Sequence, residues 1–287
     1  MSTDLDGKAA IVTGAGAGLG RAEALALANA GASVVVNDIS QAAGSVVDEI
    51  EAAGGKALLV TGDVSERATA DALLAAATEH FGGLHILVNN AGLLRDRMVF
   101  SMSDEDWDTV IRVHLRGHFL LSRNAAAYWR QQSKADGKPV YGSVVNTASE
   151  AFLVGSAGQP NYSAAKAGIA ALTVATARGC ARYGVRANAI CPRARTAMTQ
   201  EVFGEAPEGD DPLSVDHVAP FVAFLASPAA ARINGQVFVV HGGMAALLRP
   251  PTVEQRFDGD LASTVGAYFA DRDPEQMFAA TEILSLS

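Results

Sequence analysis

The stretch Ala9-Ala-Ile-Val-Thr-Gly-Ala-Gly-Ala-Gly-Leu-Gly20 decides the fold of this chain. An apolar run is followed by a glycine-rich loop, and an alanine-rich helical segment, residues 21–30, comes next. Strand, glycine loop and helix in this order form the phosphate-binding turn of a dinucleotide fold. Gly14, Gly18 and Gly20 allow the backbone to turn tightly and to approach a pyrophosphate, whose charge is stabilised by the N–H groups at the start of the helix.

The acidic residue that follows the next strand bears on the choice of cofactor. The apolar run Ser33-Val-Val-Val-Asn37 ends in Asp38, eighteen positions beyond Gly20. A carboxylate there can accept hydrogen bonds from the ribose hydroxyls of an adenosine. It would also repel a 2′-phosphate by roughly 1 to 4 kcal/mol at about 4 Å, depending on the effective dielectric. The sequence therefore predicts NAD, although Arg21 leaves NADP open, because an arginine beside the loop can accept a 2′-phosphate.

The rest of the chain indicates one large α/β domain. It has 287 residues, and 49% of them are hydrophobic, which suffices for a well-buried core. Six apolar runs alternate with helical stretches such as residues 42–53, 68–81 and 164–183. This alternation predicts a doubly wound parallel sheet of the Rossmann type with helices on both faces. The polar run 131–138 is expected to be a surface loop.

Charge and composition argue against several classes of partner. The net charge of −9 disfavours nucleic acids and anionic membranes. The acidic N-terminus lacks an apolar signal core, and no uninterrupted apolar stretch approaches the length of a membrane span, so a cytoplasmic location is expected. Cys180 and Cys191 stand in apolar surroundings, and we expect free thiols instead of a disulfide.

A tyrosine and a lysine one helical turn apart are candidates for acid–base chemistry. They occur in the run Asn161-Tyr-Ser-Ala-Ala-Lys-Ala-Gly, with Ser149 thirteen positions before Tyr162. Residues i and i+4 of a helix share a face and can touch. A phenol titrates near 10, and the ammonium group of Lys166 can bring its proton within reach of neutral-pH chemistry. Alone, this spacing also fits a surface tyrosine beside a solvated lysine.

Taken together, these motifs resemble the short-chain dehydrogenase/reductase family. That family carries T-G-x-x-x-G-x-G in its glycine loop, N-N-A-G after its fourth strand, and a Ser, Tyr-x-x-x-Lys active site. Here the second motif is Asn89-Asn-Ala-Gly92, and Asp63-Val64 follows the third strand, where the family contacts the adenine ring. The motifs run from residue 8 to about residue 243, so the resemblance covers the chain except its C-terminal tail.

The resemblance implies specific roles. A hydride passes between nicotinamide C4 and a carbonyl or carbinol carbon, while Tyr162 handles the proton at oxygen. Lys166 would lower the pKa of the tyrosine and hydrogen-bond the nicotinamide ribose, and Ser149 would hold the substrate oxygen. The cofactor-binding residues expected on this basis are Gly14, Gly18, Leu19, Gly20, Asp38, Asp63, Val64, Asn90, Ala91, Gly92, Tyr162, Lys166 and Thr196.

The chain departs from the family pattern at His114, where many members have an asparagine that holds a proton-relaying water. The imidazole could take that role and titrate near neutrality, or it could be a structural histidine; both readings stay open. His114 and His118 have the i,i+4 spacing of a zinc face. The glutamate of H-E-x-x-H and a third ligand are missing, so no metal is expected.

A second departure follows the sixth strand. The family has Pro-Gly and then a threonine that binds the nicotinamide carboxamide, whereas this chain reads Pro192-Arg-Ala-Arg-Thr196. Thr196 still fits the carboxamide role. Arg193 and Arg195 are candidates to meet an anionic substrate group such as a CoA phosphate, with solvated surface charge as the alternative.

A narrower resemblance concerns the substrate. Residues 94–117, including His114, resemble the (3R)-hydroxyacyl-CoA dehydrogenase unit of multifunctional β-oxidation enzymes, also called type 4 17β-hydroxysteroid dehydrogenase. This implies an NAD-dependent dehydrogenase acting on a secondary alcohol or ketone, most simply a (3R)-3-hydroxyacyl-CoA or a steroid or lipid relative. One alternative is a 3-oxoacyl-carrier-protein reductase using NADPH. Another is a non-catalytic NAD-binding regulator or scaffold.

The chain runs past the usual end of a single-domain member. We expect residues 1–244 to form the NAD-binding and catalytic domain and residues 245–287 to form an extension. Pro250-Pro251 breaks the chain, and residues 261–270 and 275–284 are expected to be short amphipathic helices. The extension would pack on the domain or on a neighbouring subunit, because the family usually forms a homodimer or a homotetramer.

Overall fold

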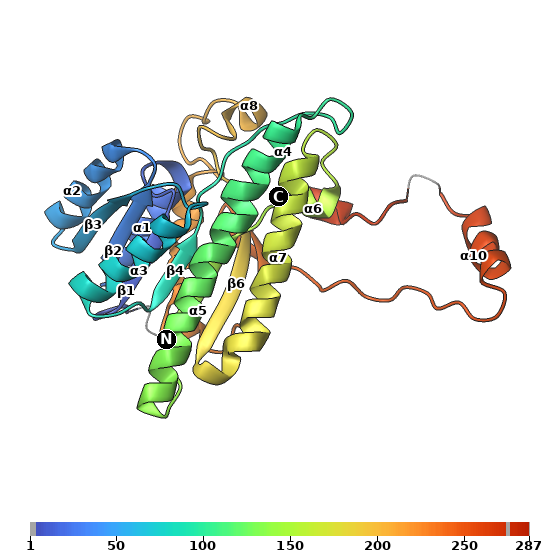
Figure 1. The fold of residues 1–287 in the computed structure, drawn as a ribbon. Helices are drawn as coiled ribbons and strands as arrows, with labels where there is room; N and C mark the ends of the chain where they lie inside the picture. The colour runs from blue at the N-terminus through green and yellow to red at the C-terminus, as the bar shows by residue number, and fades with distance from the viewer. Residues whose placement is uncertain (1–3, 274–275, 287) are drawn as a thin grey trace.

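Eight strands form one sheet in the order β3-β2-β1-β4-β5-β6-β7-β8 in the computed structural model, which describes residues 4–273 and 276–286 (Figure 1). Neighbouring strands from β3 to β7 run parallel, and β8 pairs antiparallel with β7. The strands are β1 (Ala9–Thr13), β2 (Ser33–Asp38), β3 (Lys56–Thr61), β4 (Ile86–Asn89), β5 (Gly142–Thr147), β6 (Val185–Pro192), β7 (Val237–His241) and β8 (Met244–Leu247).

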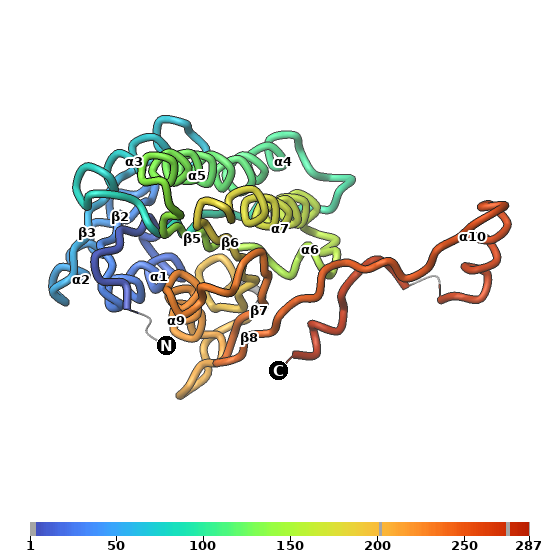
Figure 2. The backbone as a smooth tube through the Cα atoms, turned by 90° about the horizontal axis from the view of Figure 1, so that it is seen from below, coloured from blue at the N-terminus to red at the C-terminus, as the bar shows by residue number. Residues whose placement is uncertain are grey.

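Helices cover both faces of this sheet, as Figure 2 shows. One face carries α1 (Gly18–Asn29), α2 (Gly44–Ala52) and α9 (Ala219–Ala226), and the other carries α3 (Arg67–Phe81), α5 (Gly117–Asp136) and α7 (Pro160–Cys180). Shorter elements are α4 (Asp104–Ile111), α6 (Ala151–Val154) and α8 (Gln200–Phe203). The expected doubly wound Rossmann-type fold is confirmed.

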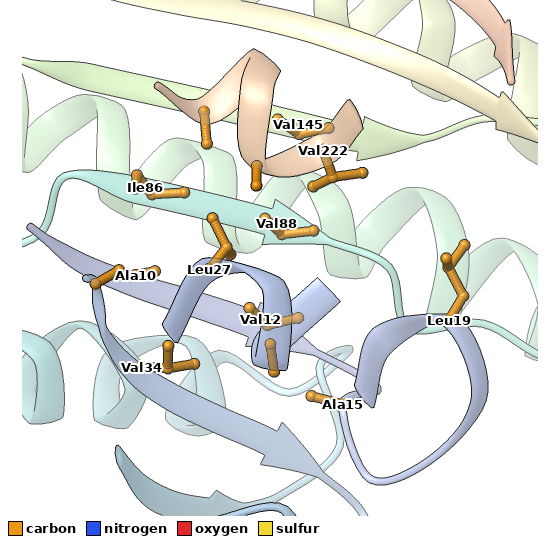
Figure 3. Close-up of a cluster of buried hydrophobic side chains, with 14 of the residues drawn as sticks. Ala10, Val12, Ala15, Leu19, Leu27, Val34, Ile86, Val88, Val145 and Val222 are labelled. Atoms are coloured by element: carbon orange, nitrogen blue, oxygen red, sulfur yellow. The ribbon is translucent and has the colours of Figure 1, made fainter. Parts of the chain in front are cut away.

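Alternating strand side chains fill two hydrophobic layers. On one face, Leu27 from α1 and Val222 from α9 lie over Val88 and Val145 of the central strands (Figure 3). On the other face, Trp129 from α5 is buried, and its indole Nε1–H donates to the Leu84 carbonyl at 2.6 Å. Strands buried on both faces need no polar alternation, which is why they appear in the sequence as continuous apolar runs.

The expected surface loop at residues 131–138 is wrong, because α5 continues to Asp136. The helix buries Ala125, Trp129 and Ser133, which recur at i, i+4 and i+8, while the polar residues between them face solvent. It ends at Gly137, whose φ of +66° is the left-handed C-cap that glycine provides. The polar run is therefore the outer face of a helix.

The C-terminal extension leaves the body and returns to it. The sheet continues through Leu247, and the chain then forms an arm that carries α10 (Leu261–Ala270) at its tip, well away from the sheet (Figures 1 and 2). The expected helix at residues 261–270 is confirmed, and none of its side chains is buried. Of the second expected helix, Glu275 lies outside the described residues, and residues 276–286 contain only the 3₁₀ turn Thr281–Ser285.

The two cysteines lie on different elements, Cys180 on α7 and Cys191 on β6. Cys180 and Cys191 are both free thiols, as expected. Among the described helices, none is long and apolar enough to cross a membrane.

Candidate active site

The glycine loop is held against the end of β4 by a threonine. The Thr13 hydroxyl accepts the N–H groups of Asn90 and Ala91 at 3.0 and 3.1 Å, and the Asn90 amide donates to the carbonyls of Thr13 and Gly14 at 3.1 and 3.3 Å. A Cβ on Gly20 would lie 2.2 Å from the Gly14 oxygen, so only glycine fits there. The N-N-A-G motif thus shapes the loop. Thr13 is a site residue that sequence reasoning missed, although it begins the T-G-x-x-x-G-x-G motif.

The residues around this loop fit a dinucleotide. Asp38 ends β2 beside the loop, and its Oδ2 accepts the Gly16 N–H at 3.0 Å. A Cβ placed on Gly16 would come 2.9 Å from that same oxygen, so the loop leaves no room for a side chain beside the carboxylate. Thr196 borders the loop from the other side, since a Cβ on Gly18 would lie 3.4 Å from the Thr196 methyl carbon. The glycine cradle and the carboxylate lie together, as the sequence predicts.

Arg21 is occupied by another partner. Its guanidinium donates to both carboxylate oxygens of Glu49 on α2, with Nε 3.1 Å from Oε1. Both side chains are about two-fifths exposed, so this ion pair contributes little stability. It does, however, direct the guanidinium toward α2.

Asp63 and Val64 lie just past the carboxyl end of β3, next to β2. Asp63 accepts the Ser65 N–H at 2.8 Å and Arg112 Nη1 at 3.0 Å. Val64 is buried, and a Cβ on Gly117 would come 2.8 Å from its side chain. Both residues are therefore firmly held at the carboxyl end of the sheet.

Ser149, Tyr162 and Lys166 come together in space. Tyr162 and Lys166 lie one turn apart on α7, and Ser149 follows β5. The Ser149 hydroxyl lies close enough to the Tyr162 phenol to act on its pKa, which it lowers. Lys166 Nζ donates to the Thr147 carbonyl at 2.5 Å and lies 5.2 Å from the centroid of the Tyr162 ring. The predicted spacing therefore forms one cluster at the carboxyl end of the sheet.

Burial dominates the electrostatics of this cluster. It raises the pKa of Tyr162 to about 12 and lowers the pKa of Lys166 to about 7. The expected lowering of the tyrosine pKa by the lysine is not met in this structure, because desolvation disfavours the charged form of both groups. The two side chains therefore rest as a neutral phenol and an amine that is readily neutralised.

A π-helical turn places His114 against Tyr162. The turn, Arg112–Arg116, joins α4 to α5, and such turns occur frequently at functional sites. The imidazole meets the Tyr162 ring edge-on, with centroids 5.2 Å apart and planes at 88°. Its Nε2 lies 2.8 Å from the Leu93 carbonyl oxygen and 3.0 Å from the Leu93 nitrogen. Gly92 makes room, because a Cβ there would come 2.2 Å from His114 Cε1.

The expectation that His114 could titrate near neutrality is wrong. Burial, and then the charge of Lys166, lower the pKa of His114 to about 3. The imidazole therefore stays neutral at physiological pH, where it hydrogen-bonds the Leu93 backbone and packs against the Tyr162 ring. His118 is also buried with a lowered pKa, and among the described residues no group of three His, Cys, Asp or Glu side chains could hold a metal ion.

Asn161 was missed by sequence reasoning, although it stands directly before the tyrosine. Its buried side-chain amide donates to the carbonyls of Arg95 and Asp106 at 2.9 and 3.2 Å, and its Oδ1 accepts the Tyr162 N–H at 2.7 Å. Asn161 thereby ties the segment that follows Gly92 to the tyrosine helix. That segment presents three exposed apolar side chains, Met98, Val99 and Phe100.

Neither reading of Arg193 and Arg195 is correct: they are not free to meet an anionic group, and they are not solvated surface charges. Arg193 pairs with Glu150 at 2.7 Å, and Arg195 pairs with Asp211 at 2.9 Å. All four side chains are about one-sixth exposed or less, so these are partly buried internal ion pairs. Each guanidinium is satisfied by a partner far away in sequence, which local pattern cannot reveal.

A buried carboxyl group on α1 was also missed. Glu23 is fully buried, one turn from Leu19 and one turn from Leu27, and neither of its oxygens has a hydrogen-bond partner in the described part of the chain. Burial raises its pKa to about 8, and Lys166 partly opposes this shift. The carboxyl is therefore mostly protonated at pH 7, a state that helical periodicity does not predict.

Known proteins are similar to this chain in sequence and in fold. The family model described as short chain dehydrogenase matches residues 8–206. The chain is 61% identical to hydroxyacyl-CoA dehydrogenase ChsB1 of Mycobacterium tuberculosis, over 99% of this chain and 95% of that protein. It is 40% identical to peroxisomal multifunctional enzyme type 2 of Mus musculus, over 85% of this chain and 33% of that longer protein.

A solved structure agrees with these sequence matches. A short chain dehydrogenase from Mycobacterium avium superposes with a TM-score of 0.81 at 46% identity, covering 92% of this chain and 94% of that one. The glycine loop, the N-N-A-G contacts with Thr13 and the cluster of Ser149, Tyr162 and Lys166 occur together on the same sheet edge. This chain belongs to the short-chain dehydrogenase family.

Proposed function

We propose that this chain is an NAD-dependent dehydrogenase that oxidises the 3-hydroxyl group of (3R)-3-hydroxyacyl-CoA thioesters or reduces the corresponding ketones. The observation that carries the proposal is the buried Tyr162 phenol, with the Ser149 hydroxyl and Lys166 beside it. The substrate class is supported by the 61% identity with a hydroxyacyl-CoA dehydrogenase over nearly the whole chain. A steroid or another lipid alcohol is a related possibility within the same chemistry.

The residues of the cluster divide the proton chemistry between them. A bound nicotinamide supplies or accepts the hydride at its C4. In the oxidation, Ser149 holds the substrate hydroxyl, and Tyr162 as phenolate takes the hydroxyl proton while the carbon loses its hydride, which leaves a ketone. In the reduction, the Tyr162 phenol returns that proton to the substrate oxygen. Lys166 lies close enough to stabilise the phenolate whenever it carries its own proton.

The choice of NAD rests on two carboxylates. Asp38 lies beside the loop, where a 2′-phosphate would have to fit, and Glu49 engages Arg21, the cation that could have balanced that phosphate. A 2′-phosphate would therefore meet a negative charge without a free guanidinium partner. This favours NAD and weighs against a 3-oxoacyl-carrier-protein reductase that uses NADPH.

An apolar rim supports an acyl substrate over a small polar one. Met98, Val99 and Phe100 are between 43% and 83% exposed on the segment that Asn161 ties to the tyrosine helix. Met198, two residues beyond Thr196, is 39% exposed. Apolar side chains left in water beside an active site commonly cover an apolar ligand.

The arm with α10 supports the homodimer or homotetramer expected from the family. Leu261, Val265 and Phe269 are at least one-third exposed on this helix, which makes no buried contact with its own domain. Light scattering coupled to size-exclusion chromatography measures the oligomeric state directly.

One screen tests the proposed activity. The purified chain is given (3R)- and (3S)-3-hydroxyacyl-CoA thioesters of graded length, and a set of hydroxysteroids, with NAD or NADP, and the absorbance of the reduced cofactor is followed. We expect turnover of the 3R thioesters with NAD, and a rate at least about 10²-fold lower in a Tyr162→Phe variant. Preference for NADP would defeat the cofactor assignment. Absence of any turnover, with NAD still bound, would favour the non-catalytic regulator or scaffold.

A further inference from the structure

Arg193 occupies the position at which the family pattern places a glycine, directly after Pro192 at the end of β6. Its guanidinium forms a two-pronged pair with Glu150, with Nε 2.7 Å from Oε2 and Nη2 2.8 Å from Oε1. Hydrogen bonding to Glu150 raises the pKa of the arginine further. Forked pairs of this kind fix geometry as well as charge. Arg193 therefore cannot be exchanged for lysine without loss of that geometry.

The same guanidinium holds the end of the chain. Its Nη1 donates to the Leu286 carbonyl at 2.7 Å, and its Nη2 donates to the Ile283 carbonyl. Both carbonyls lie in or directly after the 3₁₀ turn Thr281–Ser285, and the Ile283 carbonyl also accepts the Leu286 N–H at 3.2 Å. His241 Nε2 also lies 3.3 Å from Nη1, so Arg193 contacts strand β7 as well.

Two other contacts attach residues 280–286 to the domain. The Ala280 N–H donates to the Leu153 carbonyl at 2.8 Å, and Leu153 belongs to α6. Ile283 is only 4% exposed, and Leu286 packs against the buried cluster that contains Ala148. Figure 1 shows the segment, in red, beside α6. Residues 280–286 are thus packed on the domain although the arm before them is not.

The attachment points surround the catalytic serine. Ala148 precedes Ser149, Glu150 follows it, and Leu153 lies in the helix that begins directly afterwards. The Ser149 hydroxyl faces Tyr162 and also accepts the Ala151 N–H at 3.2 Å. Movement of Glu150 therefore moves the serine hydroxyl relative to the phenol. Without the guanidinium, a carboxylate that is only 15% exposed would lack its counter-charge and would turn toward water.

We propose that Arg193 is a positioning residue that locks residues 280–286 onto Glu150 and thereby holds the Ser149 hydroxyl in position beside the Tyr162 phenol. The last residues of the chain are then part of the catalytic architecture, although they contribute no group to the chemistry. The kinetic part of this proposal rests on the proposed dehydrogenase function, whereas the locking of residues 280–286, here called the tail, does not.

The test compares Arg193→Ala and Glu150→Gln, singly and together, with Arg130→Ala as a matched control in the full chain. Arg130 lies near the far end of α5 and hydrogen-bonds Tyr183 instead of the tail. We measure kcat, the KM for NAD and for the best secondary alcohol of the wild type, and hydrogen exchange of residues 280–286 and 148–154. Guanidinium ion is added at concentrations well below those that unfold proteins, to replace the missing group.

We expect Arg193→Ala to lower kcat by about 10- to 100-fold, since small displacements of an orienting group have effects of this size. The KM for NAD should stay within about twofold, the tail amides should exchange faster, and guanidinium ion should restore part of the rate. The double variant should lose little more than the worse single variant, because both changes break one unit. Arg130→Ala should resemble the wild type in every measurement.

Either of two results overturns the proposal: a kcat within about twofold of the wild type, or a loss of kcat with tail exchange unchanged. Tail exchange needs no substrate, so it decides the locking even if the wild type rejects every hydroxyacyl-CoA, a result that would count only against the proposed function. If Arg193→Ala melts below the assay temperature, Arg193→Lys takes its place. An ammonium keeps the charge but cannot reach Glu150 and both carbonyls together, so intermediate rates and exchange are expected.

Discussion

The buried carboxyl of Glu23 makes a quantitative prediction about stability against pH. Its pKa is about 8 in the folded chain, compared with an ordinary value of 4.5, because burial disfavours the carboxylate. The folded state therefore holds this proton more tightly than the unfolded state. The stabilisation is complete below pH 4.5 and is lost as the pH rises through about 8. At about 1.36 kcal/mol per pH unit, the full loss is roughly 5 kcal/mol as an upper limit.

Glu23→Gln removes this dependence and keeps the shape of the side chain. We expect the free energies of unfolding of the two proteins to differ little near pH 5, apart from a constant contribution of the amide. Above that pH the free energy of unfolding of the variant should rise relative to that of the wild type by at most about 1.4 kcal/mol per pH unit. The difference should level off once the carboxylate of the wild type is fully ionised. Taking the difference between the two proteins cancels the titration of other groups. The coupling between Glu23 and Lys166 does not cancel and reduces the gain.

Urea unfolding followed by circular dichroism, at fixed protein concentration and at several values between pH 5 and pH 9, measures the difference. The m-value must stay constant across the series for the free energies to be comparable. Glu51→Gln on the exposed face of α2 is the matched control and should show no such slope. A pH-independent difference between Glu23→Gln and wild type, or a slope of opposite sign, would refute the assignment of a protonated carboxyl.

Three further predictions concern the site. Tyr162→Phe should lower kcat by about 10²- to 10⁴-fold or more with NAD binding nearly unchanged, since only the phenolic oxygen is lost; retention of a tenth of the activity in an initial-rate assay would contradict its role. Asp38→Ala should weaken NAD by roughly 1.5 to 3 kcal/mol and relax discrimination against NADP, as titration calorimetry with both cofactors would show. His114→Asn should give the same pH–rate profile as the wild type between pH 5 and 8, because the imidazole, with a pKa of about 3, stays neutral there; an ionisation lost only in the variant would contradict this.

The parts of the site that the sequence predicts correctly depend on short-range spacing. The glycine loop, Asp38 at the end of β2, and the i,i+4 pair of Tyr162 and Lys166 are each specified by residues within one or two adjacent elements. Parallel strands then bring their carboxyl ends to one edge, which is why the serine, from another strand, arrives at the same place. The doubly wound fold follows from the same local alternation.

The parts that sequence reasoning missed depend on long-range partners. Arg193 and Leu286 stand 93 positions apart, and Asn161 and Arg95 stand 66 apart, so no local period could have paired them. The signal for Arg193 is an arginine where the family has glycine, whereas the burial of Asn161 has no signal in the local pattern. The π-helical turn at His114 also escapes a 3.6-residue pattern, because it inserts one residue into the helix.

Burial accounts for the remaining differences, and it acts on four groups in one direction. Tyr162 and Glu23 have raised pKa values, Lys166 and His114 have lowered ones, and in every case the neutral form is favoured. A hydrophobic pattern can show that a side chain faces inward, but it cannot show that four titratable side chains share one water-poor region. A charge that develops there is weakly screened, so the Ser149 hydroxyl and the Lys166 amine act on the phenolate far more strongly than they would at the surface. The placement of these few donors therefore matters more than the overall charge of the protein, and small displacements of Ser149 should be costly.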